Sequence, residues 1–171
     1  RINPVSDKFP TPPESTDEKQ LKLEVETGIS TVPDAFKDNE KLNTPAKIES
    51  WMKTNIQERT SGIAKENIIV YDIVLMINEN GQGWKEATTE NFPSAGLTIT
   101  LPYPKGTGEK TQDFTVCHLF TKDMNGHRAG ETEYPEVTKT KDGIQFKVHG
   151  LSPVSIGWKD VKASAGNDKQ E

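Results

Sequence analysis

The chain has 171 residues, one cysteine, a formal net charge of −5 and a pI near 5.3. This acidic balance disfavours nucleic acid and anionic lipid surfaces as partners, because both attract basic proteins. A single cysteine excludes an intramolecular disulfide framework, and the absence of an apolar run of about 18 residues or of a signal-peptide pattern predicts a soluble, mature fragment without direct membrane insertion.

Polar segments flank the region that holds most of the large apolar residues. The first 20 residues carry four of the eleven prolines and few apolar side chains, which predicts an extended linker over residues 1–20. Eleven of the twelve aromatic residues lie between Phe36 and Trp158. We therefore expect one folded domain over residues 21–160 and a second polar linker over residues 161–171. Such an arrangement is typical of one module in a longer chain.

The N-terminal part of this domain predicts one strand and one helix. Residues 21–25 alternate between apolar and polar side chains, as a half-buried strand does. Thr44 followed by Pro45 indicates a helix start, since Thr can cap the free amides and Pro tolerates the first helical position. A narrow apolar stripe, with residues at spacings of three and four, then predicts a helix near residues 45–57. We expect this helix to lie across an open end or a face of a sheet. The stripe comprises Ile48, Trp51, Met52, Asn55 and Ile56.

From residue 68 onward, short apolar runs separated by Gly, Pro, Asn and Asp predict further strands. The first of these runs is apolar on both faces except at Asp72, which is typical of a central strand. The predicted strands are Ile68–Ile77, a hairpin partner that begins at Trp84, Leu97–Leu101, Phe114–Phe120, Glu136–Lys139, Ile144–Val148 and Val154–Trp158. The expected fold class is mainly β, an antiparallel β-sandwich of about seven or eight strands with one N-terminal helix.

Cysteine and histidine residues are present without the spacing of a catalytic or metal site. Cys117 lies in a predicted strand and His118 points to the opposite face, so we expect a buried structural thiol and no nucleophile. His118, His127 and His149 could in principle meet around a metal, but none is paired at the spacing that zinc sites use. Surface or packing histidines are the interpretation that we favour.

Two acidic segments have a functional and a structural interpretation. Residues 123–126 (DMNG) begin like a calcium loop, but glycine comes at the fourth position and no glutamate closes the loop, so a plain turn is favoured. Glu131 and Glu133 would share a face of an extended segment, separated by about 7 Å along the strand, which is compatible with either glycosidase mechanism and diagnostic of neither. A solvated, charged loop is favoured.

Four apolar or aromatic residues are candidates for a binding surface. Tyr103 and Tyr134 each precede a proline, and such corners either act as binding platforms or pack the end of a sheet. Trp51 and Met52 on the predicted helix could supply an apolar anchor for a partner. We expect no catalytic, cofactor-binding or metal-binding residue.

The second half of the chain resembles a known module. Its motifs are Asn91–Pro93, Gly96–Pro104 with Gly106–Gly108, Phe114–Phe120, Gly143–Phe146 and Leu151–Trp158. Over about residues 44–160 they resemble a C-terminal β-sandwich module of large cell-wall-anchored or membrane-tethered surface proteins of Gram-positive gut clostridia, similar to those of Lachnospiraceae. The resemblance implies an extracellular location on the bacterial cell surface, next to other domains of the same protein, and assigns no catalytic residue.

Three functions are compatible with these observations. The first is a non-catalytic structural or stalk module that projects other domains from the cell wall. The second is an adhesin module that binds a host immunoglobulin, mucin glycoprotein or glycan through loops or a strand edge. The third is an accessory domain of a secreted glycan-active enzyme, whose catalytic part would lie elsewhere.

Overall fold

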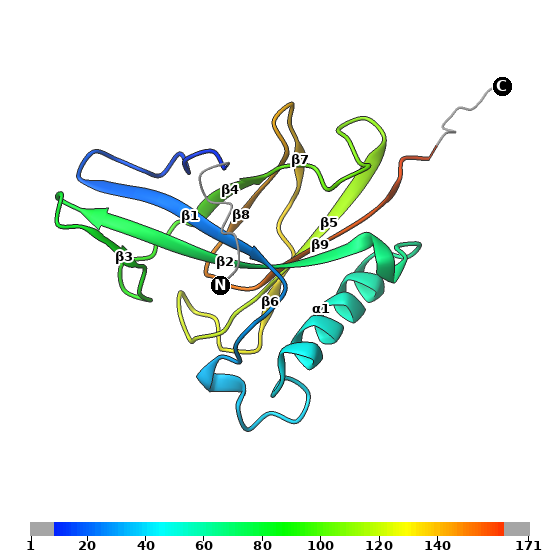
Figure 1. Ribbon diagram of the computed structural model, residues 1–171, viewed down its shortest axis with the longest axis horizontal. Helices are drawn as coiled ribbons and strands as arrows, with labels where there is room; N and C mark the ends of the chain where they lie inside the picture. The colour runs from blue at the N-terminus through cyan, green and yellow to red at the C-terminus, as the bar shows by residue number, and fades with distance from the viewer. Residues whose placement is uncertain (1–8, 163–171) are drawn as a thin grey trace.

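The computed structural model describes residues 9–162, so residues 1–8 and 163–171 of the two predicted linkers lie outside the described residues. Two antiparallel sheets face each other, and one helix packs on the outer side of the larger sheet (Figure 1). The prediction of a mainly β sandwich is confirmed. The described part of the chain has nine strands, more than the seven or eight expected, because the short strand at Thr132–Glu133 has no alternating apolar pattern. No helix of this part is long and apolar enough to span a membrane.

The larger sheet has the order β1-β2-β9-β5-β6, with β3 paired to β2, and the smaller sheet has the order β4-β8-β7. The strands of the larger sheet are β1 (Lys19–Thr27), β2 (Ile68–Glu79), β3 (Trp84–Glu86), β5 (Gln112–Leu119), β6 (Thr132–Glu133) and β9 (Val154–Asp160). Those of the smaller sheet are β4 (Leu97–Leu101), β7 (Thr138–Lys139) and β8 (Ile144–Val148). The helical segments are α1 (Pro45–Arg59) and the 3-10 turns η2 (Asp34–Phe36) and η3 (Lys65–Asn67).

Strand β2 contributes to two separate cores because its side chains alternate between two faces. Ile73 and Leu75 point between the sheets and belong to the sandwich core. Ile68 and Val70 point to the other face, into the core between the larger sheet and α1. The central-strand prediction for this run is confirmed, since β2 pairs with β1 on one side and with β9 and β3 on the other.

Helix α1 begins as its sequence predicts. Thr44 caps the helix by accepting a hydrogen bond at Oγ1 from the backbone N–H of Lys47 (3.1 Å), and Pro45 occupies the first turn. The helix buries Ile48, Met52 and Ile56, one residue per turn, against β2, β5 and β9. It packs closely because β9 has a glycine beneath it, Gly157, where a Cβ atom would lie 2.6 Å from Ile56 Cγ2.

The segment before β1 is fixed to both sheets. The Glu14 carboxylate accepts hydrogen bonds from the backbone N–H (2.9 Å) and the hydroxyl (2.8 Å) of Thr98 in β4, and Ser15 Oγ accepts one from the N–H of Leu21 in β1 (2.9 Å). Both are edge strands, and capped edges resist pairing with other chains. Residues 9–20, expected as linker, therefore belong to the fold because side-chain oxygens bind these edges.

We predict that Met52→Ala lowers the free energy of unfolding by about 2–5 kcal/mol, because it leaves a cavity in a core position with no exposed surface. Urea denaturation followed by circular dichroism measures this change. Thr54→Ala, at an exposed position of the same helix, is the control and should change stability by less than about 0.5 kcal/mol. Equal effects of the two substitutions would contradict the packing of α1.

We also predict that Glu14→Ala lowers the free energy of unfolding by about 1–3 kcal/mol, since it removes two hydrogen bonds from the edge of β4. The matched control is Glu18→Ala, whose side chain is exposed. Urea denaturation reports the stability. If Glu14→Ala is as stable as Glu18→Ala, the segment before β1 does not hold the edge of β4.

Candidate functional site

A cleft of about 280 Å³ lies beside β2. Helix α1 packs on β2, β5 and β9 and leaves the region of β1, β3 and the second half of β2 without a covering helix (Figure 1). Asp72 and Val74 line the cleft and share a face of β2 with Val70, which α1 covers. The cleft thus lies next to the N-terminal half of α1, where its cover of β2 ends. We call it the β2 cleft.

Six segments of the chain build the β2 cleft, and its lining mixes polar and apolar side chains. The lining residues are Ile29, Thr31 and Pro33 between β1 and η2, Ile48 of α1, Asp72, Ile73, Val74 and Leu75 of β2, Glu86, Ala87, Thr88, Thr89 and Phe92 from β3 onward, Thr121, Lys122 and Met124 after β5, and Leu151, Ser152 and Pro153 before β9. Its polar side chains carry hydroxyl, carboxylate and ammonium groups, which can donate hydrogen bonds to a ligand or accept them from it.

Ser152 fixes the position of the acidic group in the β2 cleft. Its hydroxyl donates a hydrogen bond to Asp72 Oδ1 (2.5 Å) and accepts one from the backbone N–H of Ile73 (3.0 Å). Pairing between β2 and β9 ends at the pair Tyr71–Val154. Directly beyond this pair, Ser152 joins the segment before β9 to β2. Asp72 is held in one orientation before any ligand arrives, which lowers the entropy cost of binding.

A second cluster of polar residues lies on the other side of the loop between β5 and β6 (residues 120–131, the β5–β6 loop). It comprises all three histidines of the chain with two glutamates, and we call it the histidine cluster: His118, His127, His149, Glu131 and Glu133. Glu133 is at its centre. Its carboxylate is 2.9 Å from Nδ1 of His118, 2.9 Å from Nδ1 of His149 and 2.7 Å from the backbone N–H of His149.

These contacts determine the charge of the cluster at neutral pH. Burial by itself raises the pKa of Glu133, but the hydrogen bonds from His118 and His149 outweigh burial and hold that pKa at about 2. Burial lowers the pKa of His118, and the hydrogen bond to Glu133 opposes this shift only in part. Near neutral pH the cluster therefore contains an ionised glutamate and a neutral, buried imidazole.

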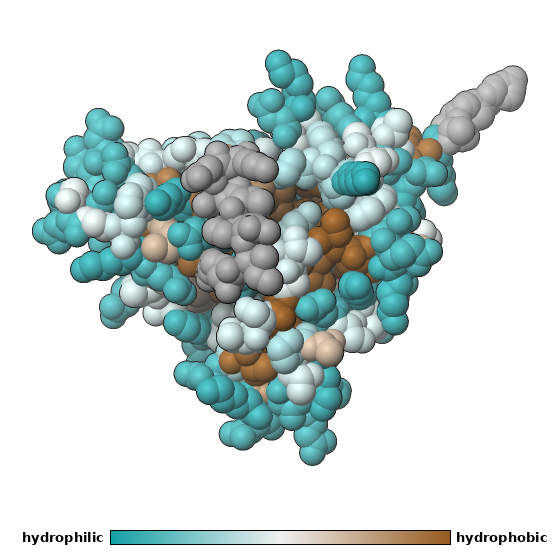
Figure 2. Space-filling view, viewed as in Figure 1, coloured by the Kyte–Doolittle hydropathy of each residue, from teal (hydrophilic) through white to brown (hydrophobic). Residues whose placement is uncertain are grey.

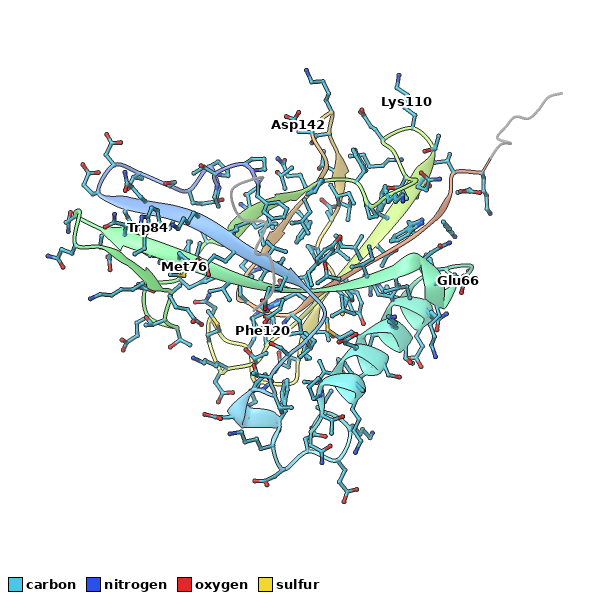
Figure 3. All side chains as sticks on the ribbon, in the orientation of Figure 1. Glu66, Met76, Trp84, Lys110, Phe120 and Asp142 are labelled. Atoms are coloured by element: carbon cyan, nitrogen blue, oxygen red, sulfur yellow. The ribbon has the colours of Figure 1, made fainter. Side chains whose placement is uncertain are left out.

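Phe120, labelled near the centre of Figure 3, joins His127 to the rest of the cluster. The His127 ring stacks on it with centroids 4.2 Å apart, and the His118 ring contacts it edge-on at 4.5 Å. His127 Nδ1 lies 3.2 Å from Glu131. The histidines thus meet around a glutamate and a phenylalanine, and no group of three or more His, Cys, Asp or Glu among residues 9–162 is arranged to hold a metal ion.

The glycosidase interpretation of Glu131 and Glu133 has no support in this arrangement. A general acid requires a raised pKa, and the pKa of Glu133 is lowered. The solvated-loop interpretation fits Glu131, whose side chain is about half exposed, but Glu133 is largely buried in β6. The reason is its pairing with His118 across β5 and β6, which brings the carboxylate onto a buried ring.

Cys117 is buried in the core under α1, and burial raises the pKa of its thiol to about 11. His118 points to the opposite face, so the predicted burial of Cys117 and the predicted separation of the two side chains are confirmed. The plain-turn prediction for residues 123–126 is also confirmed, because Met124 and His127 exchange two backbone hydrogen bonds around the turn. The Asp123 carboxylate is occupied by the backbone N–H of Ala129 (2.9 Å).

The candidate anchor on α1 needs correction. Met52 has no exposed surface and belongs to the core, since it lies on the buried side of the helix between Ile48 and Ile56. It is therefore removed from the binding surface. Trp51 is half-buried, packs against the same core, and its carbonyl accepts a hydrogen bond from Asn55 (2.7 Å).

The two candidate tyrosines make contacts with different parts of the structure. Tyr103 packs against Phe114 and donates a hydrogen bond to the carbonyl of Thr140 (2.6 Å), so it packs the end of the sheet. Tyr134 donates to Asn55 Oδ1 (3.2 Å) and lies under the guanidinium of Arg59, 4.5 Å from its ring centroid. It also lines a shallow groove of about 420 Å³ on the outer side of the smaller sheet. The structure does not bring the four candidates together into one site.

The sequence interpretation missed Trp84 as a surface residue. Its side chain is 39% exposed, and Lys22 Nζ lies 4.3 Å from its ring centroid. Trp84 and Glu86 share a face of β3, so Trp84 lies on the same side of the sheet as the β2 cleft, near Met76 (Figure 3). On the face drawn in Figure 2, apolar residues surface near the middle of the molecule and the periphery is hydrophilic.

Comparison with family models, with curated proteins and with solved structures gives no match for this chain. The resemblance to a surface-protein module therefore stays a prediction.

We predict that Ser152→Ala lowers the free energy of unfolding by about 1–3 kcal/mol, because it leaves the N–H of Ile73 and the Asp72 carboxylate without this hydroxyl. Thermal or urea unfolding measures the difference. The control is Ser94→Ala at an exposed position, which should be near neutral. Equal stability of the two variants would show that Ser152 does not hold the cleft together.

Proposed function

We propose that this chain is a non-catalytic module of a bacterial surface protein, outside the cell, and that it contributes to adhesion by binding a ligand in the β2 cleft. The observation that carries the proposal is the fixed Asp72–Ser152 pair, which lies in the β2 cleft at the end of the helix cover. Polar groups held in place by rigid strands favour recognition, since little ordering entropy is lost on binding.

A glycan of a host glycoprotein fits the chemistry of this cleft. Hydroxyl side chains line it together with two carboxylates and one ammonium group, and such groups donate and accept the hydrogen bonds that sugar hydroxyls need. Apolar side chains such as Ile48 and Val74 suit the C–H face of a sugar ring. A cleft of about 280 Å³ is at the small end for a ligand site, so one part of a larger ligand would enter it. Trp84 would contact the part that continues along the sheet.

A purely structural role is the second candidate, and one observation favours it. The capped edges of β1 and β4 keep the module from pairing with its neighbours, which suits a spacer in an extended chain of domains. An accessory role for a glycan-active enzyme would use the same glycan contact as the adhesin. The experiment below separates a binding module from a spacer.

The test is a binding screen of the folded chain against a glycan array, mucin glycoproteins and immunoglobulins of several classes, with heat-unfolded protein as a control. We predict saturable binding to glycan-bearing ligands. Asp72→Asn should weaken it about 10- to 100-fold, because a hydrogen bond to a charged group contributes about 1.5–3 kcal/mol. Asp72→Asn keeps an oxygen that can accept the Ser152 hydroxyl, so the fold should persist.

The matched control is Asp142→Asn, at an exposed position in the turn between β7 and β8 and away from β2 (Figure 3). This variant should bind like the wild type. Equal binding by Asp72→Asn and Asp142→Asn would show that the ligand does not bind in the β2 cleft. If the folded chain binds nothing in the panel, the spacer role replaces the adhesive one.

A further inference from the structure

The β5–β6 loop lies between the β2 cleft and the histidine cluster. Thr121, Lys122 and Met124 of this loop line the cleft, while His127 of the same loop belongs to the histidine cluster and Phe120 contacts the rings of His118 and His127. The loop is tightly packed against the turn after β8. A Cβ atom on Gly150 would lie 2.9 Å from the Phe120 ring and 3.0 Å from the Met124 sulfur. A change in the conformation of the histidine cluster therefore acts directly on the loop residues that form one wall of the β2 cleft.

One carboxylate ties this region together. Glu133 follows the loop in β6, and it binds the His118 ring in β5 and both the ring and the backbone of His149 after β8. Strands β5 and β6 belong to the larger sheet and β8 to the smaller one. The Glu133 contacts thus join the two sheets at the base of the loop.

His118 is the member of the cluster that cannot take a second proton without cost. Its side chain has no exposed surface, and with Nδ1 donating to Glu133 the neutral ring leaves Nε2 unprotonated. Nε2 is buried and has no hydrogen-bond partner among the described residues. A proton at Nε2 would place an N–H donor where nothing accepts it, and an unsatisfied buried donor is strongly unfavourable.

The ionisable groups that face His118 come from three other elements. Glu133 in β6 favours a charged ring, whereas His127 in the β5–β6 loop and His149 after β8 oppose it when they are protonated. Burial outweighs the attraction of Glu133, so the folded state holds the pKa of His118 below its ordinary value.

We propose that the histidine cluster is an acid-sensitive switch that holds the β5–β6 loop in place near neutral pH and releases it when His118 takes up a proton. The regulatory consequence, weaker ligand binding in acid, rests on the proposed function of the β2 cleft. The switch itself does not.

The direction of the pH dependence follows from linkage. An exposed histidine takes up its proton near pH 6.5, and His118 does so at a lower pH while the loop is closed. The open form binds more protons, so opening is favoured as the pH falls below about 6.5, by at most about tenfold per pH unit for one proton. Glu133 keeps its charge until about pH 2, so the histidine and not the glutamate sets this range.

Amide hydrogen exchange of the full chain, at about pH 7.5 and about pH 5.5 and corrected for intrinsic exchange rates, tests the switch. We expect residues 120–133 to open more at the lower pH, by up to about tenfold, while the β1–β2 ladder changes little. His118→Gln should abolish this pH dependence. His127→Gln should retain it, since His127 is partly exposed and its partner Glu131 is about half exposed.

An NMR titration of the wild-type imidazoles keeps the test decisive if His118→Gln fails to fold. Loop opening that follows the titration of His118 supports the switch. Titration of His118 without any change in loop exchange overturns it, as does unchanged pH dependence in a folded His118→Gln. Affinity for a glycan found in the screen should fall at about pH 5.5; constant affinity with an opening loop would overturn the regulatory step alone. The exchange result holds whether or not the screen finds a ligand, so the two proposals fail separately.

Discussion

The arrangement of this domain depends on the way β2 divides its side chains between two faces. Ile73 and Leu75 fill the space between the sheets, and Ile68 and Val70 lie under α1. The helix covers only the first part of the strand. Its buried stripe has Ile56 near Ile68 at the start of β2 and ends with Ile48 at the border of the cleft. The next two residues on the same face of β2 as Val70 are Asp72 and Val74. The end of one packing interface therefore creates the polar cleft to which we assign ligand binding.

The second constraint is electrostatic. A buried carboxylate is stable only when hydrogen bonds compensate its lost hydration, and Glu133 obtains three of them from two histidines. That requirement brings β6 and the turn after β8 together and sets the base of the β5–β6 loop. The cleft and the histidine cluster are thus two sides of one loop. Binding and acidity would act on the same segment, one through its contacts with a ligand and the other through its attachment to the sheets.

Much of the fold could be predicted from alternation and helix spacing, because those patterns follow from local geometry. The faces of Cys117 and His118 and the cap at Thr44 are of this kind. The candidate sites could not be predicted so well. A helical stripe does not say which residue lies deepest, so Met52 was assigned to a surface that it does not reach. The meeting of His118, Glu133 and His149 requires strand order and register, and Glu14 binds Thr98 across a separation of 84 residues.

Ligand binding is proposed at the place where the helix cover of β2 ends. An amide chemical-shift titration of the isotopically labelled chain with mucin-derived glycans tests it most directly. We expect saturable shifts at Asp72 and Val74, in the segment from Ala87 to Phe92, and in the β5–β6 loop. Shifts confined to the outer side of the smaller sheet around Tyr134, or no shifts at saturating glycan concentrations, would contradict it.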